Sequence, residues 1–217
     1  MFLIPSLVKD HNQAQGTDQL RKRDGLLYKE EIFSIMSPKL TILQGGEDVK
    51  KRSCHKMFED LVSKNGVRRM LIIPWTTASE EKEKEYRDVL YHYFKDVGFS
   101  EIRFLERDDT EMMIEEKFAN SDVLYLPGGD PSILLKEVNT RLIGGRIATF
   151  KGIIIGNSAG AIVLSSGGFA DGIFYDGMGL LNVKVEVHSK LDSVPTNASK
   201  DTIVGIPEDG WILVRAS

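Results

Sequence analysis

The sequence contains few of the residues that hold metals or form disulfides. Cys54 is the only cysteine, so an internal disulfide is excluded, and four histidines are scattered over 217 residues. None of these side chains has the spacing of a metal-ligand cluster. We therefore expect a protein that needs neither a metal nor an organic cofactor.

Long hydrophobic runs and an excess of basic charge are also missing. No segment approaches the ~20 apolar residues of a membrane span, and the apolar start 1–5 is short and broken by Pro5. The formal net charge is −4 and the basic residues are dispersed. This composition argues against nucleic-acid and membrane partners and predicts a cytoplasmic protein.

The length and composition are those of a soluble chain with one core. Apolar residues make up 41% and charged residues 28%. Residues 1–36 are polar for much of their length and have no sustained periodicity, so we expect an N-terminal arm outside the compact fold. Residues 37–217 are predicted to form a single domain, and Met36 is a possible start for it.

Strand-like and helix-like segments alternate through this domain. That pattern is typical of an α/β fold with a mostly parallel sheet covered by helices on both faces. The helices are expected at 54–65, 80–97 and from Pro131 onward, and buried or partly buried strands at 40–46, 69–74, 101–105, 124–126 and 153–155.

A glycine-flanked serine follows one of these strands. Gly156-Asn157-Ser158-Ala159-Gly160 comes directly after three isoleucines and opens a short apolar helix. The sharp turn between strand and helix would leave the Ser158 hydroxyl exposed at the carboxyl edge of the sheet. This context favours a nucleophile over the two alternatives, a glycine-rich phosphate loop and a tight packing turn.

A serine nucleophile needs a base, and His188 is the only histidine after Ser158. It ends the alternating run 181–187, where a strand is expected to leave the sheet. His11 lies in the polar arm, and His55 and His92 lie in predicted helices, where structural roles are expected.

The group that orients the base is less well defined by the sequence. Glu208 lies between two apolar runs, although its Pro-Glu-Asp-Gly segment also suits an ordinary hairpin turn. Asp192, and upstream Asp171 or Asp176, are the alternatives.

Four segments together resemble the peptidase E / cyanophycinase family of serine peptidases. They are 124–130 with its glycine turn, 156–161 around Ser158, Gly177–Leu181 followed by His188, and 205–208 ending in Glu208. The resemblance implies a class I glutamine-amidotransferase-like fold, a flavodoxin-like three-layer αβα sandwich with a mostly parallel central sheet.

By this resemblance, Ser158 is the nucleophile, His188 the base and Glu208 its acidic partner. The backbone N–H groups of Gly129 and Ala159 would form the oxyanion hole. The chain order serine, histidine, acid differs from the serine, acid, histidine order of standard α/β-hydrolases.

The predicted function is therefore hydrolysis of a small peptide or amide bond by a cytoplasmic serine peptidase. Asp130 and Asn157 are expected to contact the substrate. The resemblance favours aspartyl substrates, either Asp-X dipeptides or β-aspartyl linkages, with Arg146 or Lys190 as possible carboxylate partners. A monomer or homodimer is expected. The alternative is a non-catalytic, amidotransferase-like binding module for a small ligand.

Overall fold

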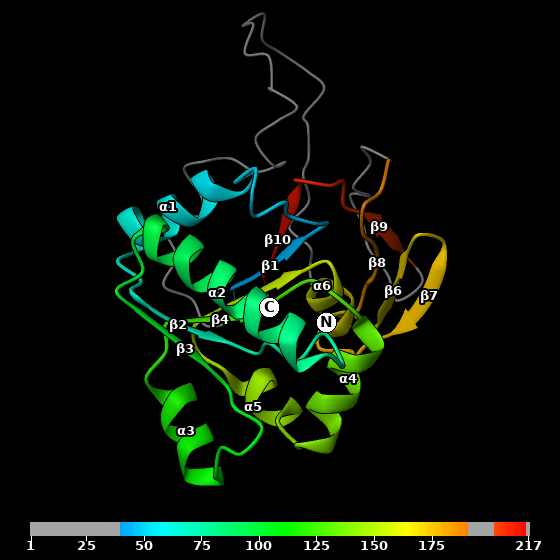
Figure 1. Ribbon diagram of the computed structural model, residues 1–217. Helices are drawn as coiled ribbons and strands as arrows, with labels where there is room; N and C mark the ends of the chain where they lie inside the picture. Colours follow the sequence, from blue (N-terminus) through cyan, green and yellow to red (C-terminus); the bar gives the residue numbers. More distant parts are fainter. Residues whose placement is uncertain (1–39, 191–201, 216–217) are drawn as a thin grey trace, which may run out of the picture.

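A computed structural model describes residues 40–190 and 202–215. Its centre is a six-stranded sheet with strand order β10-β1-β5-β4-β2-β3 (Figure 1). All neighbouring strands are parallel except β10, which pairs antiparallel with β1. The strands are β1 (Leu40–Gln44), β2 (Arg69–Ile72), β3 (Glu101–Phe104), β4 (Val123–Leu126), β5 (Ile153–Asn157) and β10 (Trp211–Arg215).

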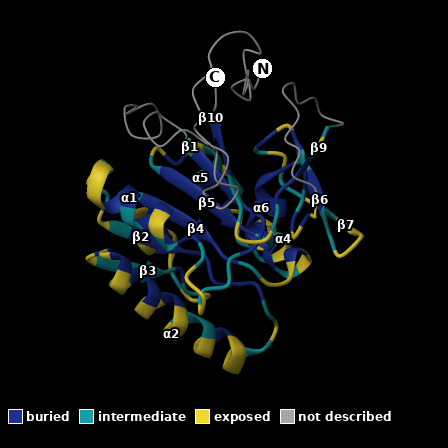
Figure 2. Cartoon of the chain, turned by 90° about the horizontal axis from the view of Figure 1, so that it is seen from above, coloured by how far each residue is buried: buried dark blue, intermediate teal, exposed yellow. Residues whose placement is uncertain are grey.

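Helices cover both faces of this sheet. One face packs against α1 (His55–Asn65) and α2 (Glu80–Val97), and the other against α3 (Glu111–Ala119), α4 (Pro131–Thr140), α5 (Gly144–Thr149) and α6 (Ala159–Leu164). Each interface has its own apolar core, and the buried strands lie between helices whose outer sides are exposed (Figure 2). The α/β class with a mostly parallel central sheet is confirmed.

The helix ends follow local rules that the sequence contains. Ser79 caps α2, because its hydroxyl accepts a hydrogen bond of 3.3 Å from the Lys82 N–H. Gly66 ends α1 in the left-handed conformation at φ 68°, which glycine adopts without a steric penalty. By contrast, α3 and α5 were not expected from the sequence.

A second sheet of four strands was also not expected. It has the order β7-β6-β8-β9 and consists of β6 (Gly167–Ala170), β7 (Ile173–Asp176), β8 (Lys184–Glu186) and β9 (Ile203–Gly205). The alternating run 181–187 contributes only three strand residues, and these belong to this second sheet. The turn at 207–210 is not a hairpin, because it leads from β9 in the small sheet to β10 in the large one.

The parallel strands β1 and β5 mark the position of the candidate site. Gln44 and Asn157 are register partners at the carboxyl ends of these strands. The following helices, α1 and α6, pack on opposite faces of the sheet. Such a reversal opens a crevice at the carboxyl edge, which is where open α/β sheets bind ligands.

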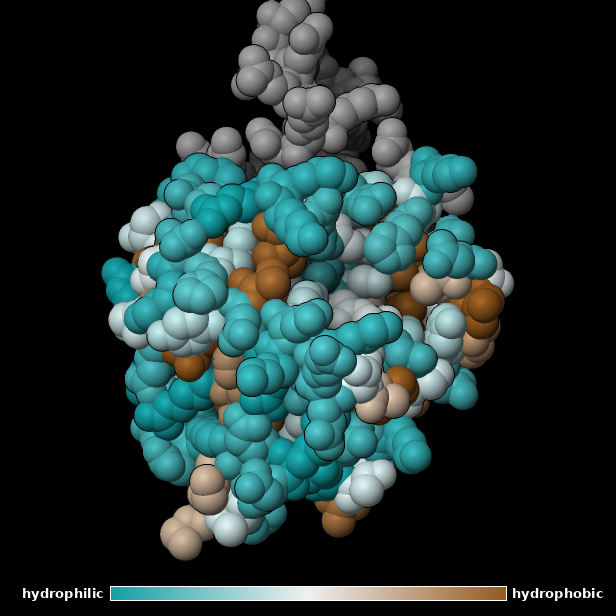
Figure 3. Space-filling model, in the orientation of Figure 1, coloured by the Kyte–Doolittle hydropathy of each residue, from teal (hydrophilic) through white to brown (hydrophobic). Residues whose placement is uncertain are grey.

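The surface seen in Figure 3 is mainly hydrophilic, with apolar side chains in separate small patches. Among the described residues, none of the helices combines the length and apolar character that crossing a membrane requires.

Candidate active site

Ser158 occupies a strained turn between β5 and α6. Its backbone has φ 46° and ψ −101°, a region that side-chain-bearing residues rarely adopt. The turn is fixed because the Ser158 N–H donates to the Gln44 carbonyl at 2.9 Å. This is the geometry of a nucleophile elbow, in which the hydroxyl leaves the carboxyl edge of the sheet.

The glycines on either side of Ser158 allow strand and helix to touch. A Cβ at Gly160 would lie 2.1 Å from the Leu126 carbonyl oxygen, and one at Gly156 would lie 2.6 Å from the Gly160 backbone. Both positions exclude any larger residue, because real Cβ atoms do not come so close to backbone atoms. The motif is therefore needed to bring α6 against β4 and β5.

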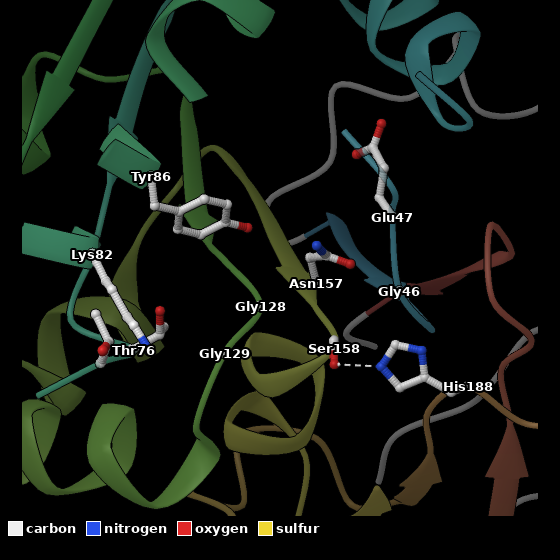
Figure 4. A pocket seen from close by; sticks show the side chains of 11 residues that line it. Gly46, Glu47, Thr76, Lys82, Tyr86, Gly128, Gly129, Asn157, Ser158 and His188 are labelled. Atoms are coloured by element: carbon white, nitrogen blue, oxygen red, sulfur yellow. Dashed lines mark hydrogen bonds between the residues drawn. The ribbon is translucent and has the colours of Figure 1, made fainter. Parts of the chain in front are cut away.

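His188 lies beside Ser158. Its Nε2 is 3.0 Å from the Ser158 Oγ, within hydrogen-bond distance (Figure 4). His188 follows β8, and its N–H donates to the Gly45 carbonyl at 2.9 Å. The next residue, Ser189, donates to the Ile206 carbonyl at 3.0 Å, so this turn is attached to both sheets.

The other histidines lie elsewhere. His55 pairs with Glu59 on α1 at 3.3 Å, and His92 lies on the exposed side of α2. His11 lies outside the described residues. Among residues 40–190 and 202–215, no group of three side chains is arranged to hold a metal ion.

The structure does not place a carboxylate against His188. Within the described residues, no carboxylate oxygen lies within 4.0 Å of either ring nitrogen. Glu208 is exposed in the turn before β10, while Asp171 and Asp176 are exposed around β7. Asp192 lies outside the described residues. The acidic partner of His188 therefore stays a prediction.

The turn that carries Glu208 is nevertheless attached to the site. The Asp209 N–H donates to the Gly46 carbonyl at 2.7 Å, and the Gly45 N–H donates to the Gly210 carbonyl at 3.0 Å. Gly45 also accepts from His188, so one dipeptide holds both the histidine turn and the Glu208 turn.

Two backbone N–H groups near Ser158 have no acceptor in the described part of the chain. They belong to Gly129 and Ala159, the residues predicted to form the oxyanion hole. Gly129 has φ 136°, and a Cβ there would lie 2.6 Å from the Thr76 side chain. The glycine turn after β4 can therefore approach Thr76 only because position 129 lacks a side chain.

Ser158 and His188 open into a pocket of about 450 Å³. Lys82, Tyr86 and Thr76 lie across the pocket from the Ser158–His188 pair (Figure 4). The described residues that line the pocket are Gly46, Glu47, Thr76, Thr77, Lys82, Tyr86, Gly128, Gly129, Asn157, Ser158 and His188.

The residues predicted to contact the substrate lie in different places in the structure. Asn157 lines the pocket, but Asp130 does not, because its carboxylate caps α4 by accepting from the Ser132 and Ile133 N–H groups. Arg146 pairs with Glu111 outside the pocket. Lys190 is exposed, and it is not among the pocket-lining residues.

Sequence reasoning missed Lys82 and Glu47. Lys82 lies on the polar side of α2 and resembles an ordinary solvated lysine. Burial raises the pKa of Glu47 from its ordinary 4.5 to about 6. Burial, followed by the nearby Glu47 carboxylate, also raises the pKa of Tyr86 to about 12, so this phenol stays neutral at physiological pH. Only tertiary contacts reveal that these α2 and post-β1 residues line the same pocket as Ser158.

An α/β sheet with a serine elbow, a histidine at 3.0 Å and a pocket at the switch point defines a hydrolase-like protein. The sequence profile of peptidase family S51 matches residues 40–216. The chain therefore belongs to peptidase family S51, which makes it a serine peptidase by family.

Solved structures share the fold at low sequence identity. A peptidase from an acI-B1 Actinobacterium superposes with a TM-score of 0.64 at 22% identity, covering 83% of this chain and 84% of that chain. A putative peptidase E protein from Listeria monocytogenes EGD-e gives 0.55 at 20% identity, covering 83% and 100%. No curated protein matches the sequence significantly.

Proposed function

We propose that this protein hydrolyses a small peptide or amide bond with Ser158 as nucleophile and His188 as general base. The observation that carries the proposal is the 3.0 Å contact between Ser158 Oγ and His188 Nε2 in a strained elbow that faces a pocket. Backbone strain of this kind persists where the surrounding structure holds a functional side chain in place.

The geometry suits acyl transfer. Nε2 takes the Ser158 proton as Oγ attacks the scissile carbonyl carbon, and the resulting oxyanion lies near the Gly129 and Ala159 N–H groups. Nε2 then returns the proton to the leaving amine as the C–N bond breaks. His188 then deprotonates a water molecule that attacks the acyl carbon, and it returns this proton to Ser158 Oγ as the C–Oγ bond breaks and the acid leaves. Each oxyanion donor contributes roughly 10²–10³ in kcat in comparable enzymes.

Glu208 is proposed as the group that orients His188. The support is the family resemblance and the attachment of its turn to Gly45 and Gly46, which also hold the histidine segment. A Ser-His-Glu arrangement requires the Glu208 carboxylate to turn from solvent toward the Nδ1 side of the ring.

Aspartyl substrates are proposed, either as Asp-X dipeptides or with β-aspartyl linkages. Lys82 supports an acidic substrate, because no carboxylate of a described residue lies within 4.0 Å of its ammonium group. A substrate carboxylate in the pocket could therefore pair with this ammonium without displacing an existing partner. Arg146 is already paired with Glu111.

A binding module without turnover is the second candidate. The observation that favours it is that no described carboxylate contacts His188. Loss of the orienting acid lowers turnover by about 10⁴-fold in the well-studied triads, so an elbow and pocket could survive for ligand binding alone.

Labelling with a fluorophosphonate probe separates the two candidates. The native chain should gain one adduct at Ser158, detected by intact mass and peptide mapping, and Ser158→Ala should gain none. Hydrolysis of Asp-Leu, β-Asp-Leu and Asn-Leu then tests the substrate class. A folded chain that neither reacts with the probe nor cleaves any of these peptides would reject the peptidase proposal.

A further inference from the structure

One wall of the pocket is rich in hydrogen-bond acceptors that have no donor. They are Glu47 Oε2, shortly after β1, and Asn157 Oδ1, at the end of β5; the nearby Gln44 side chain, whose amide oxygen and nitrogen are both unpaired, does not line the pocket. Gln44 and Asn157 are register partners, so their side chains leave the same face of the sheet. Their exposed fractions are only 0% and 2%. Such buried acceptors are normally paired, because an unpaired one loses its hydrogen bonds to water without replacement.

Glu47 has one oxygen engaged and one oxygen unpaired. Its Oε1 accepts from the Tyr93 hydroxyl and, at 3.2 Å, from the Cys54 N–H at the start of α1. Its Oε2 has no hydrogen bond of good geometry, although the Gln44 side chain lies near enough to offset part of the rise that burial causes in the pKa of Glu47. No described lysine, arginine or histidine lies within 4.0 Å of the carboxylate. With a pKa of about 6, the side chain is mainly charged at neutral pH. A carboxylate beside a pocket without a cation lacks its usual counter-charge.

We propose that Glu47, with the amide oxygen of Asn157, forms a subsite that binds an ammonium group of the substrate. An ammonium has three N–H donors, no acceptor and a positive charge, so it complements these acceptors and the carboxylate. A neutral donor or a water molecule would donate hydrogen bonds to these acceptors but would not neutralise the charge of the carboxylate. This inference rests on the proposed function, because the subsite and Ser158 share one pocket.

The ammonium can come from two parts of a peptide, either its free α-amino group or a lysine side chain. Lys82, across the pocket, carries the opposite charge (Figure 4). The pocket thus offers separate sites for the cationic and anionic groups of a zwitterionic peptide.

The test measures peptide binding by calorimetry to the Ser158→Ala protein, so that turnover is not required. Asp-Leu is compared with N-acetyl-Asp-Leu, and N-acetyl-Asp-Lys with N-acetyl-Asp-norleucine. We expect one of the two ammonium-bearing peptides to bind roughly 10- to 100-fold more tightly than its neutral counterpart. The pair that differs identifies the source of the ammonium.

Adding Glu47→Gln to Ser158→Ala should reduce that ratio to near one. The amide can still accept from Tyr93 and Cys54, so the helix contact is kept while the charge is lost. Tyr93→Phe is the matched control, because it removes a hydrogen bond to Glu47 and retains the carboxylate. It should lower the melting temperature but preserve the ratio.

Ratios near one for both pairs, an unchanged ratio in Glu47→Gln, or no binding of any of these peptides would overturn the subsite. Hydrolysis by the native chain is scored separately. Cleavage without ammonium preference rejects only the subsite, whereas ammonium-dependent binding without cleavage rejects only the peptidase function.

Discussion

The imidazole of His188 lies directly against the backbone of Gly46. A Cβ at position 46 would fall 2.3 Å from the His188 Cε1 and 2.7 Å from its Nδ1. Gly46 itself has φ 155°, which is disfavoured for residues with a side chain. The position of the candidate base is therefore set by the absence of a side chain on the segment after β1.

Gly46→Ala should lower kcat/KM by about 100-fold, because a catalytic group displaced by about 1 Å can lose that much rate. Peptide hydrolysis and the rate of fluorophosphonate labelling at Ser158 measure the effect. Gly66→Ala is the control, since Gly66 also has a positive φ but nothing lies within 4 Å of its added Cβ. Gly66→Ala should lower the free energy of unfolding and leave kcat/KM unchanged. Equal activity losses in both variants would show that Gly46 acts through stability alone.

Glu208→Gln should keep the chain folded and lower kcat by several orders of magnitude, as loss of the orienting carboxylate does in other triads. Asp192→Asn should change kcat only mildly. Purified variants are compared by steady-state kinetics, with circular dichroism to check folding. The reverse ranking would transfer the orienting role to Asp192 and make Glu208 a turn residue.

Lys82→Gln should raise KM for Asp-Leu roughly 10-fold, because a hydrogen bond between charged groups contributes about 1.5–3 kcal/mol. KM for Asn-Leu should change little, since that substrate has no side-chain carboxylate. Lys84→Gln on the same helix is exposed and is not one of the described pocket-lining residues, so it controls for the change in net charge. An equal effect of the two substitutions on Asp-Leu would contradict direct carboxylate binding by Lys82.

The raised pKa of Glu47 predicts that this residue lowers stability at neutral pH. Burial favours the protonated form, so the folded state is penalised as pH rises through about 6, and the penalty is absent below the ordinary value of 4.5. The shift corresponds to about 2 kcal/mol.

Glu47→Gln should thus increase the free energy of unfolding by up to about 2 kcal/mol at pH 8 and leave it unchanged near pH 4. Urea denaturation of both chains at the two pH values measures this difference. Equal stability of the native and Glu47→Gln chains at pH 8 would mean that the buried charge carries no penalty.

Much of the fold follows from local patterns that the sequence contains. The elbow at Ser158 lies within a continuous strand, turn and helix, and the flanking glycines are needed there because backbone atoms approach closely. Helix boundaries at Ser79 and Gly98 likewise depend on neighbouring residues only. The second sheet was missed because its strands are only three or four residues long, and such short runs have little periodicity.

The sequence by itself determined the α/β class, the serine elbow and the identity of the histidine that follows it. The tertiary structure decided that Gly46 holds this histidine, that Asp130 is used as a helix cap, and that Lys82 and Glu47 line the same pocket as Ser158. Capping and elbow geometry depend on residues close in the chain, so they leave a readable pattern. A pocket wall combines side chains from separate strands and helices, and its composition is set only when long-range pairing brings those segments together.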